Sequence, residues 1–138
     1  GMKIETRVDA LGATVGEELL RVHRSYLKPV TEMGASVTIK GLAHITGGGI
    51  LENLPRIFPK GCAARIEKGA WPVLPVFELL AREGDVAETE MYRVFNMGAG
   101  MLIVVSAQDA ERMPARAGGL DVYRAGAIVR GDGDVTLV

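Results

Sequence analysis

Three consecutive glycines, Gly47 to Gly49, form the part of the sequence best suited to bind an anion. Apolar residues precede them with the alternation of a strand and follow them at helical spacing, so the predicted order is strand, glycine loop, helix. The N–H groups of such a loop can approach a phosphate closely, and the helix dipole favours negative charge at its first turn. The spacing matches neither the Walker A loop nor the dinucleotide fingerprint, so a plain tight turn is the alternative.

His44 precedes this loop. Beside a bound anion its imidazole could transfer a proton or stabilise a developing negative charge. An isolated histidine is also commonly a structural residue. His44 is therefore predicted as a catalytic candidate, with a structural role as the alternative.

Helices and strands alternate in the elements predicted to position these residues. Thr14 and Glu17 have the spacing of a capping box, so a helix is expected to start there and to fray beyond Lys28. Further helices are expected at 50–58, at 76–84, at 88–95 with Asp85 and Glu88 as a capping pair, and after Ser106. Strands are expected at 37–45, 62–66, 101–105, 122–129 and 135–138, the last two around a hairpin turn at Gly131-Asp132-Gly133. These elements predict an α/β (α+β) fold, a layered mixed sheet of about five strands with about four helices.

The composition limits the classes of function. The chain has 138 residues, 48% of them apolar, which suits a single domain over 1–138. Sixteen basic and seventeen acidic side chains give a net charge of -1, so neither nucleic acid nor a membrane is an expected partner. Two histidines and one cysteine do not predict a metal site, and the single cysteine suits a reducing, cytoplasmic setting.

Four separated blocks of the sequence carry a family resemblance: His44-Ile-Thr-Gly-Gly-Gly49, Glu52-Asn53-Leu-Pro55-Arg56, Gly69-Ala-Trp71-Pro72-Val-Leu-Pro75-Val-Phe77 and Glu90-Met-Tyr92-Arg93-Val-Phe95-Asn96-Met97-Gly98-Ala-Gly100-Met101. In order and spacing they resemble the C-terminal domain of aminoimidazole ribonucleotide synthetase, also called phosphoribosylformylglycinamidine cyclo-ligase. The resemblance implies an α/β domain that closes the cleft of a two-domain, ATP-dependent ligase of purine biosynthesis. ATP would phosphorylate the formyl amide oxygen of formylglycinamidine ribonucleotide, and an amidine nitrogen would then close the imidazole ring.

The resemblance also implies roles for residues of this chain. His44 is expected near the reacting oxygen, and the expected contacts to a small phosphorylated ligand are Thr46, Gly47, Gly48, Gly49, Asn53 and Asn96. The family block Pro-Thr-Arg-Ile-Tyr-Val-Lys appears here as Val22-His23-Arg24-Ser25-Tyr26-Leu27-Lys28. Arg24 and Lys28 are therefore candidate anion contacts, with a solvated helix face as the alternative.

The family's N-terminal domain, which supplies the dimer barrel and most of the ATP and Mg²⁺ site, is not found in residues 1–138. The chain is therefore expected to act as the C-terminal domain, or a separately encoded relative, of the cyclo-ligase, and to be inactive alone. Its expected partners are an N-terminal half encoded separately and further copies of itself in a homo-oligomer. Departures from the family at Thr31-Glu-Met-Gly34 and Ala125-Gly126-Ala127 favour the alternative, a stand-alone ligand-binding or interaction module that has lost the reaction.

Overall fold

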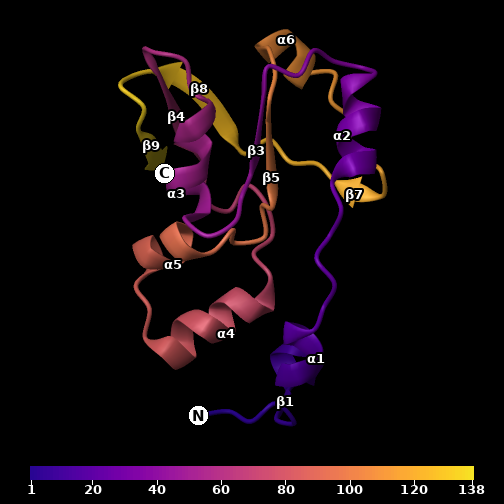
Figure 1. The fold of residues 1–138 in the computed structure, drawn as a ribbon, viewed down its shortest axis with the longest axis vertical. Helices are drawn as coiled ribbons and strands as arrows, with labels where there is room; N and C mark the ends of the chain where they lie inside the picture. Colours follow the sequence, from indigo (N-terminus) through magenta and orange to yellow (C-terminus); the bar gives the residue numbers. More distant parts are fainter.

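The computed structural model describes residues 1–138 and has the predicted mixed α/β composition (Figure 1). The helices are α1 (Val15–Leu19), α2 (Leu27–Gly34), α3 (Gly49–Asn53), α4 (Pro75–Gly84), α5 (Glu88–Val94) and α6 (Ala107–Ala110), with two 3-10 helices, η1 (Asp9–Leu11) and η2 (Leu54–Ile57). The strands are β1 (Arg7–Val8), β2 (Ala13–Thr14), β3 (Gly41–His44), β4 (Cys62–Ile66), β5 (Met101–Val104), β6 (Arg116–Ala117), β7 (Leu120–Asp121), β8 (Gly126–Arg130) and β9 (Val135–Leu137). They form four small sheets rather than one.

The molecule is elongated, with β1 and α1 at one end of its long axis and α6 with the β4–β8–β9 sheet at the other (Figure 1). The core lies between these ends, where α3 and α5 pack against the sheets. Its four most buried large side chains are Ile45, Ile50, Leu54 and Met91. Residues 1–26, the N-terminal arm, contain no buried residue.

The antiparallel pair β3–β5 sets the position of His44. Its register places His44 opposite Met101. Beyond β3, the Ile45 N–H donates to the Gly100 carbonyl at 2.9 Å, so the pairing extends to the start of the glycine loop. Because side chains alternate along a strand, Ala43 and Ile45 enter the core while His44 is exposed.

The three-stranded sheet differs from the predicted hairpin. Strands β8 and β9 do not pair with each other; β4 lies between them, antiparallel to β8 and parallel to β9. The turn at Gly131–Asp134 therefore carries the chain across β4. The structure also shortens two predicted strands, because 37–40 and 122–125 lie outside the regular strands.

The capping box at Thr14 is confirmed, but the predicted length of its helix is wrong. Thr14 Oγ1 accepts from the Glu17 N–H at 3.2 Å, and Glu17 Oε2 accepts from the Thr14 N–H at 2.7 Å. The helix nevertheless ends at Leu19. Leu20 and Val22 are 83% and 94% exposed, so no packing surface supports a longer helix.

Prolines and one aspartate explain the other differences in the helices. Pro29 lies in the first turn of the separate helix α2, where its missing N–H breaks no hydrogen bond. Pro55 follows α3, and the predicted helix 50–58 continues there as the 3-10 helix η2. The capping prediction for Asp85 is wrong: Asp85 ends α4 in the left-handed conformation, with φ of 48°, and α5 has no side-chain cap. The Ser106 cap of α6 is confirmed.

The protein exposes more surface than its mass predicts. Its accessible surface is 8877 Å², whereas a monomeric protein of 14.7 kDa exposes about 6,900 Å². Large apolar side chains contribute to this excess, including Leu19, Leu20, Val22 and Leu27 at the end of the arm and the start of α2.

None of the helices has the length and apolar composition required to cross a lipid bilayer.

Candidate functional site

The glycine loop presents free backbone donors beside His44. Thr46, Gly47 and Gly48 link β3 to α3, and Thr46 and Gly47 are exposed. The N–H groups of these three residues donate to no acceptor in the protein. The next N–H, that of Gly49, closes the turn by donating to the Thr46 carbonyl at 3.0 Å. Three successive unpaired N–H groups are a suitable arrangement for holding an anion.

Gly49 is required for packing as well as for conformation. Its φ is +56°, and a Cβ on this residue would lie 1.9 Å from the Tyr92 carbonyl oxygen. The backbones of α3 and α5 therefore approach each other here more closely than any side chain allows. Gly48 is also left-handed, with φ of +97°, whereas Gly47 has open space around its Cα. The three glycines thus have different roles.

Asn53 holds the glycine loop from inside the core. It is 5% exposed. Its amide nitrogen donates to the carbonyl oxygens of Gly49 at 2.8 Å, Gly47 at 3.1 Å and Thr46 at 3.4 Å. Because its amide group donates to these carbonyls, Asn53 fixes the loop whose N–H groups at Thr46, Gly47 and Gly48 are unpaired. That it also contacts a ligand stays a prediction.

A carboxylate lies close to the same loop. Glu52 is exposed, and its Oε2 lies 2.9 Å from the position that a Cβ on Gly48 would take. A negative charge there opposes an anion on the loop, so a bound phosphate requires Glu52 to turn away or a cation to bridge the two groups.

His44 belongs to an aromatic cluster that the sequence analysis did not predict. The ring centres of His23 and His44 are 5.3 Å apart, with an interplanar angle of 84°. Tyr26 lies 5.9 Å from His44 and 6.1 Å from His23. The Tyr26 hydroxyl oxygen occupies the space that a Cβ atom on Gly100 would take. No local signal indicates this contact, because 21 residues separate the two histidines.

The other predicted site residues are not brought to the loop by any observed contact. Lys28 lies on α2, which packs on β6, and its Nζ is 3.8 Å from Glu32 Oε1. Arg24 is exposed in the arm. Asn96 Oδ1 accepts from the Gly98 N–H at 2.9 Å and so shapes the turn before β5. Ligand contacts by these three residues stay predictions.

The turn before β5 is further fixed by Trp71. The Trp71 Nε1 donates to the Met97 carbonyl at 2.9 Å. Met97 is left-handed, with φ of +49°, which is uncommon for a residue other than glycine. Together Trp71 and Asn96 hold the turn that carries the chain from α5 to the strand beside His44.

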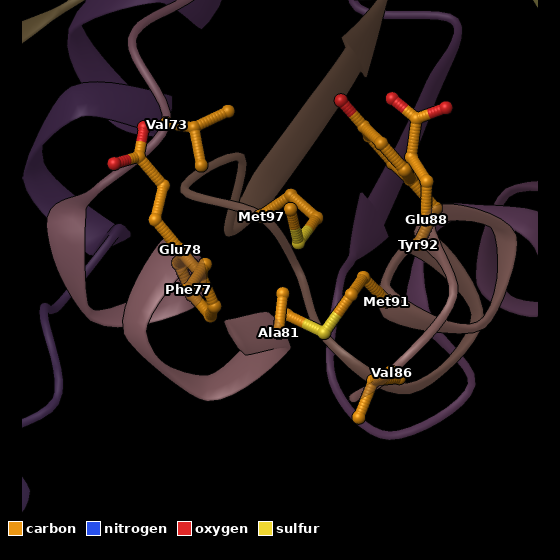
Figure 2. A pocket seen from close by; sticks show the side chains of 9 residues that line it. All are labelled: Val73, Phe77, Glu78, Ala81, Val86, Glu88, Met91, Tyr92 and Met97. Atoms are coloured by element: carbon orange, nitrogen blue, oxygen red, sulfur yellow. The ribbon is translucent and has the colours of Figure 1, made fainter. Parts of the chain in front are cut away.

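A separate cavity of about 290 Å³ lies between α4 and α5 (Figure 2). Its lining is mostly apolar and contains no residue of the glycine loop or of the aromatic cluster: Val73, Phe77, Glu78, Ala81, Val86, Glu88, Met91, Tyr92 and Met97. Glu88 is bound to Lys68 at 2.8 Å, and this bond raises the pKa of the lysine. Burial, and then the Glu88 charge, raise the pKa of Tyr92.

The chain is similar to a known family model and to several known proteins. The family model described as AIR synthase related protein, C-terminal domain, matches residues 2–138. Three proteins named phosphoribosylformylglycinamidine cyclo-ligase are similar to the chain. The protein of Syntrophotalea carbinolica is 44% identical over 100% of this chain and 41% of its own length. That of Caldicellulosiruptor saccharolyticus is 46% identical over 98% and 40%, and that of Brevibacillus brevis is 49% identical over 80% and 32%. The chain thus spans about two fifths of the length of these relatives or less.

Proposed function

Because this chain belongs to the AIR synthase related protein family and matches its C-terminal domain, we propose that it supplies the phosphate-binding glycine loop of a phosphoribosylformylglycinamidine cyclo-ligase. The observation that carries the proposal is the run of three unpaired N–H groups, from Thr46 to Gly48, beside the exposed His44. In this proposal the loop binds a phosphoryl group of a ribonucleotide or nucleotide. The remaining part of the enzyme supplies most contacts to ATP and Mg²⁺.

The residues of this site take distinct roles in the proposal. The loop N–H groups neutralise charge on the phosphorylated ligand. His44, at the end of β3, faces the amide oxygen that is phosphorylated before ring closure, where an imidazole can stabilise charge or move a proton. Asn53 is a positioning residue, since its three hydrogen bonds hold the loop carbonyls inward.

The exposed apolar side chains of the N-terminal arm support the proposal that a partner binds there. Leu19, Leu20 and Val22 are 67%, 83% and 94% exposed in the chain. Apolar groups clustered in this way commonly mark an interface. We propose that the remaining part of the cyclo-ligase covers them, so that the arm and the glycine loop face a shared cleft.

The second candidate is an interaction module without catalysis. The observation that favours it is the same apolar arm, because such a surface can bind a partner protein whether or not the ligase reaction takes place. The two candidates differ in what they require of His44: the ligase needs its imidazole, whereas the module does not.

The test is rescue of a purine auxotroph that lacks cyclo-ligase, using this chain together with the N-terminal part of a relative. We expect the wild-type pair to rescue growth, His44→Ala to abolish rescue, and the exposed Lys60→Ala to behave as the wild type. Rescue by His44→Ala would contradict the catalytic role of His44, and failure of the wild-type pair to rescue growth would favour the module. Circular dichroism of each variant separates loss of function from loss of fold.

Binding to the loop is tested directly by titrating the chain with ribose 5-phosphate and following its backbone amide signals. Shifts confined to Thr46, Gly47 and Gly48 would support the loop as the anion site. Saturable shifts elsewhere, with none at these three residues, would overturn it.

A further inference from the structure

Both histidines of the chain meet on the surface, although they come from different parts of the fold. His23 belongs to the N-terminal arm and His44 ends β3, and both side chains are exposed. None of their four ring nitrogens is hydrogen-bonded to the protein, and neither is the Tyr26 hydroxyl. Because both rings are exposed, these nitrogens are free to bind water or an ion.

The spacing of the two rings fits a shared metal ion. A zinc–nitrogen bond of about 2.1 Å places each imidazole centre about 3.2 Å from the ion, so two such rings at a tetrahedral angle have centres about 5.2 Å apart. The observed separation is 5.3 Å. A plain edge-to-face pair allows the same distance. The unpaired nitrogens and the exposure of both rings leave the pair accessible to an ion, and metal titration distinguishes the two interpretations.

Tyr26 fixes the arm against β3 and β5. Its ring contacts both histidines edge-on, and its hydroxyl occupies the space left by the missing side chain of Gly100. Residues 19–25 of the arm are all exposed, so the Tyr26 contact is what places His23 beside His44. Tyr26 thus acts as a positioning residue for the pair.

We propose that His23 and His44 form an open binding site for one divalent late transition-metal ion, such as Zn²⁺, Ni²⁺ or Cu²⁺. Imidazole nitrogen is a preferred ligand of these ions, and Cu²⁺ is expected to bind most tightly of the three. With two protein ligands, the ion keeps positions for water or for a small anion. His23 stands where the related family block has threonine, so the site is a property of this chain.

The proposal has a consequence for the glycine loop, and this consequence rests on the proposed function. If His44 serves the reaction, a metal ion on its imidazole competes with that role. Zn²⁺ is then expected to inhibit the assembled ligase, and His23→Phe is expected to relieve the inhibition while basal activity is kept.

Metal binding to the chain itself tests the site independently of any activity. Calorimetric titration with Zn²⁺ and Cu²⁺ is expected to give one saturable site. His23→Phe retains an aromatic ring but removes the nitrogens, and is expected to weaken binding at least about tenfold, as is His44→Phe. Lys60→Ala serves as the surface control and is expected to bind as the wild type does.

Electron paramagnetic resonance of the Cu²⁺ complex provides the second measurement. We expect hyperfine coupling from two imidazole nitrogens in the wild type and from one in His23→Phe. Absence of saturable binding, equal affinity in His23→Phe and wild type, or coupling from a single imidazole in the wild type would each overturn the proposal. If metal binds as expected but the auxotroph is not rescued, the metal site stands and the proposed function fails.

Discussion

The core and the N-terminal arm are stabilised in opposite ways. In the core, Ile50 is fully buried, and Leu54 and Met91 are 2% and 1% exposed. In the arm, residues 1–26 include no buried side chain, and the structure depends on local hydrogen bonds such as those of the Thr14–Glu17 capping box. Capping can therefore start a helix, but only packing extends it, since α1 ends after five residues.

The packing of the arm against α4 is also loose. A surface pocket of about 240 Å³ lies between residues such as Leu11 and Val15 of the arm and Leu79 and Leu80 of α4. The arm therefore contacts α4 less closely than the elements of the core contact one another. This difference predicts that the core keeps its stability when the arm unfolds.

The largest effect is expected from Gly49→Ala in the core. The new Cβ would overlap the Tyr92 carbonyl oxygen and would force alanine into a left-handed conformation. A loss above about 4 kcal/mol in the free energy of unfolding is expected, enough to unfold much of the protein. Urea denaturation followed by circular dichroism measures it.

Gly47→Ala is the control for this prediction, because the same change in the same loop meets nothing within 4 Å. Its effect is expected to stay within about 0.5 kcal/mol. Equal destabilisation by the two variants would show that the close approach of α3 and α5 is not what requires glycine.

A smaller contrast is expected between Ile50→Ala and Leu20→Ala. Ile50 is fully buried, so its truncation leaves a cavity and is expected to cost about 2–5 kcal/mol. Leu20 is 83% exposed, and its truncation is expected to change stability by less than about 0.5 kcal/mol. Denaturation of both variants measures the contrast, and a loss above about 2 kcal/mol for Leu20→Ala would show that the arm is packed in solution.

The same comparison shows which parts of the fold could be predicted from the sequence. The capping residues Thr14 and Ser106, the strand at 62–66 and the helix that follows Pro75 have local signals, and the structure has each of them. The position of β4 between β8 and β9 has no such signal, because it is set by pairing between residues 60 to 71 positions apart in the sequence. The predicted end of α1 is wrong for a related reason: Leu19 and Leu20 continue the apolar pattern, but they are 67% and 83% exposed, so packing does not support a longer helix.

The candidate site also contains residues that the sequence predicts and residues that only the structure reveals. His44 and the glycines were found because a strand, a loop and a helix adjoin in the sequence. His23 and Tyr26 were not, because only the path of the arm brings them to β3. The hydrogen bonds by which Asn53 holds the loop from inside the core could be recognised only in the structure. In the sequence, a side chain that holds a loop and one that binds a ligand have the same pattern.

The smallest expected effect is a local response of the arm to acid. The hydrogen bond from the Thr14 N–H, and then the Thr14 hydroxyl, lower the pKa of Glu17 in the folded state. A lowered folded pKa means that the capping box is fully stabilising above the ordinary carboxyl pKa and is lost as the pH falls through the lower folded value. The protection factors of the α1 amides, taken relative to the intrinsic exchange rate at each pH, are therefore expected to fall in this acid range while those of α3 stay unchanged. In Glu17→Gln, which cannot titrate, the protection factors of α1 are expected to lose this pH dependence. A parallel fall in α1 and α3 would show that the arm and the core unfold as one unit, and would remove the distinction between them.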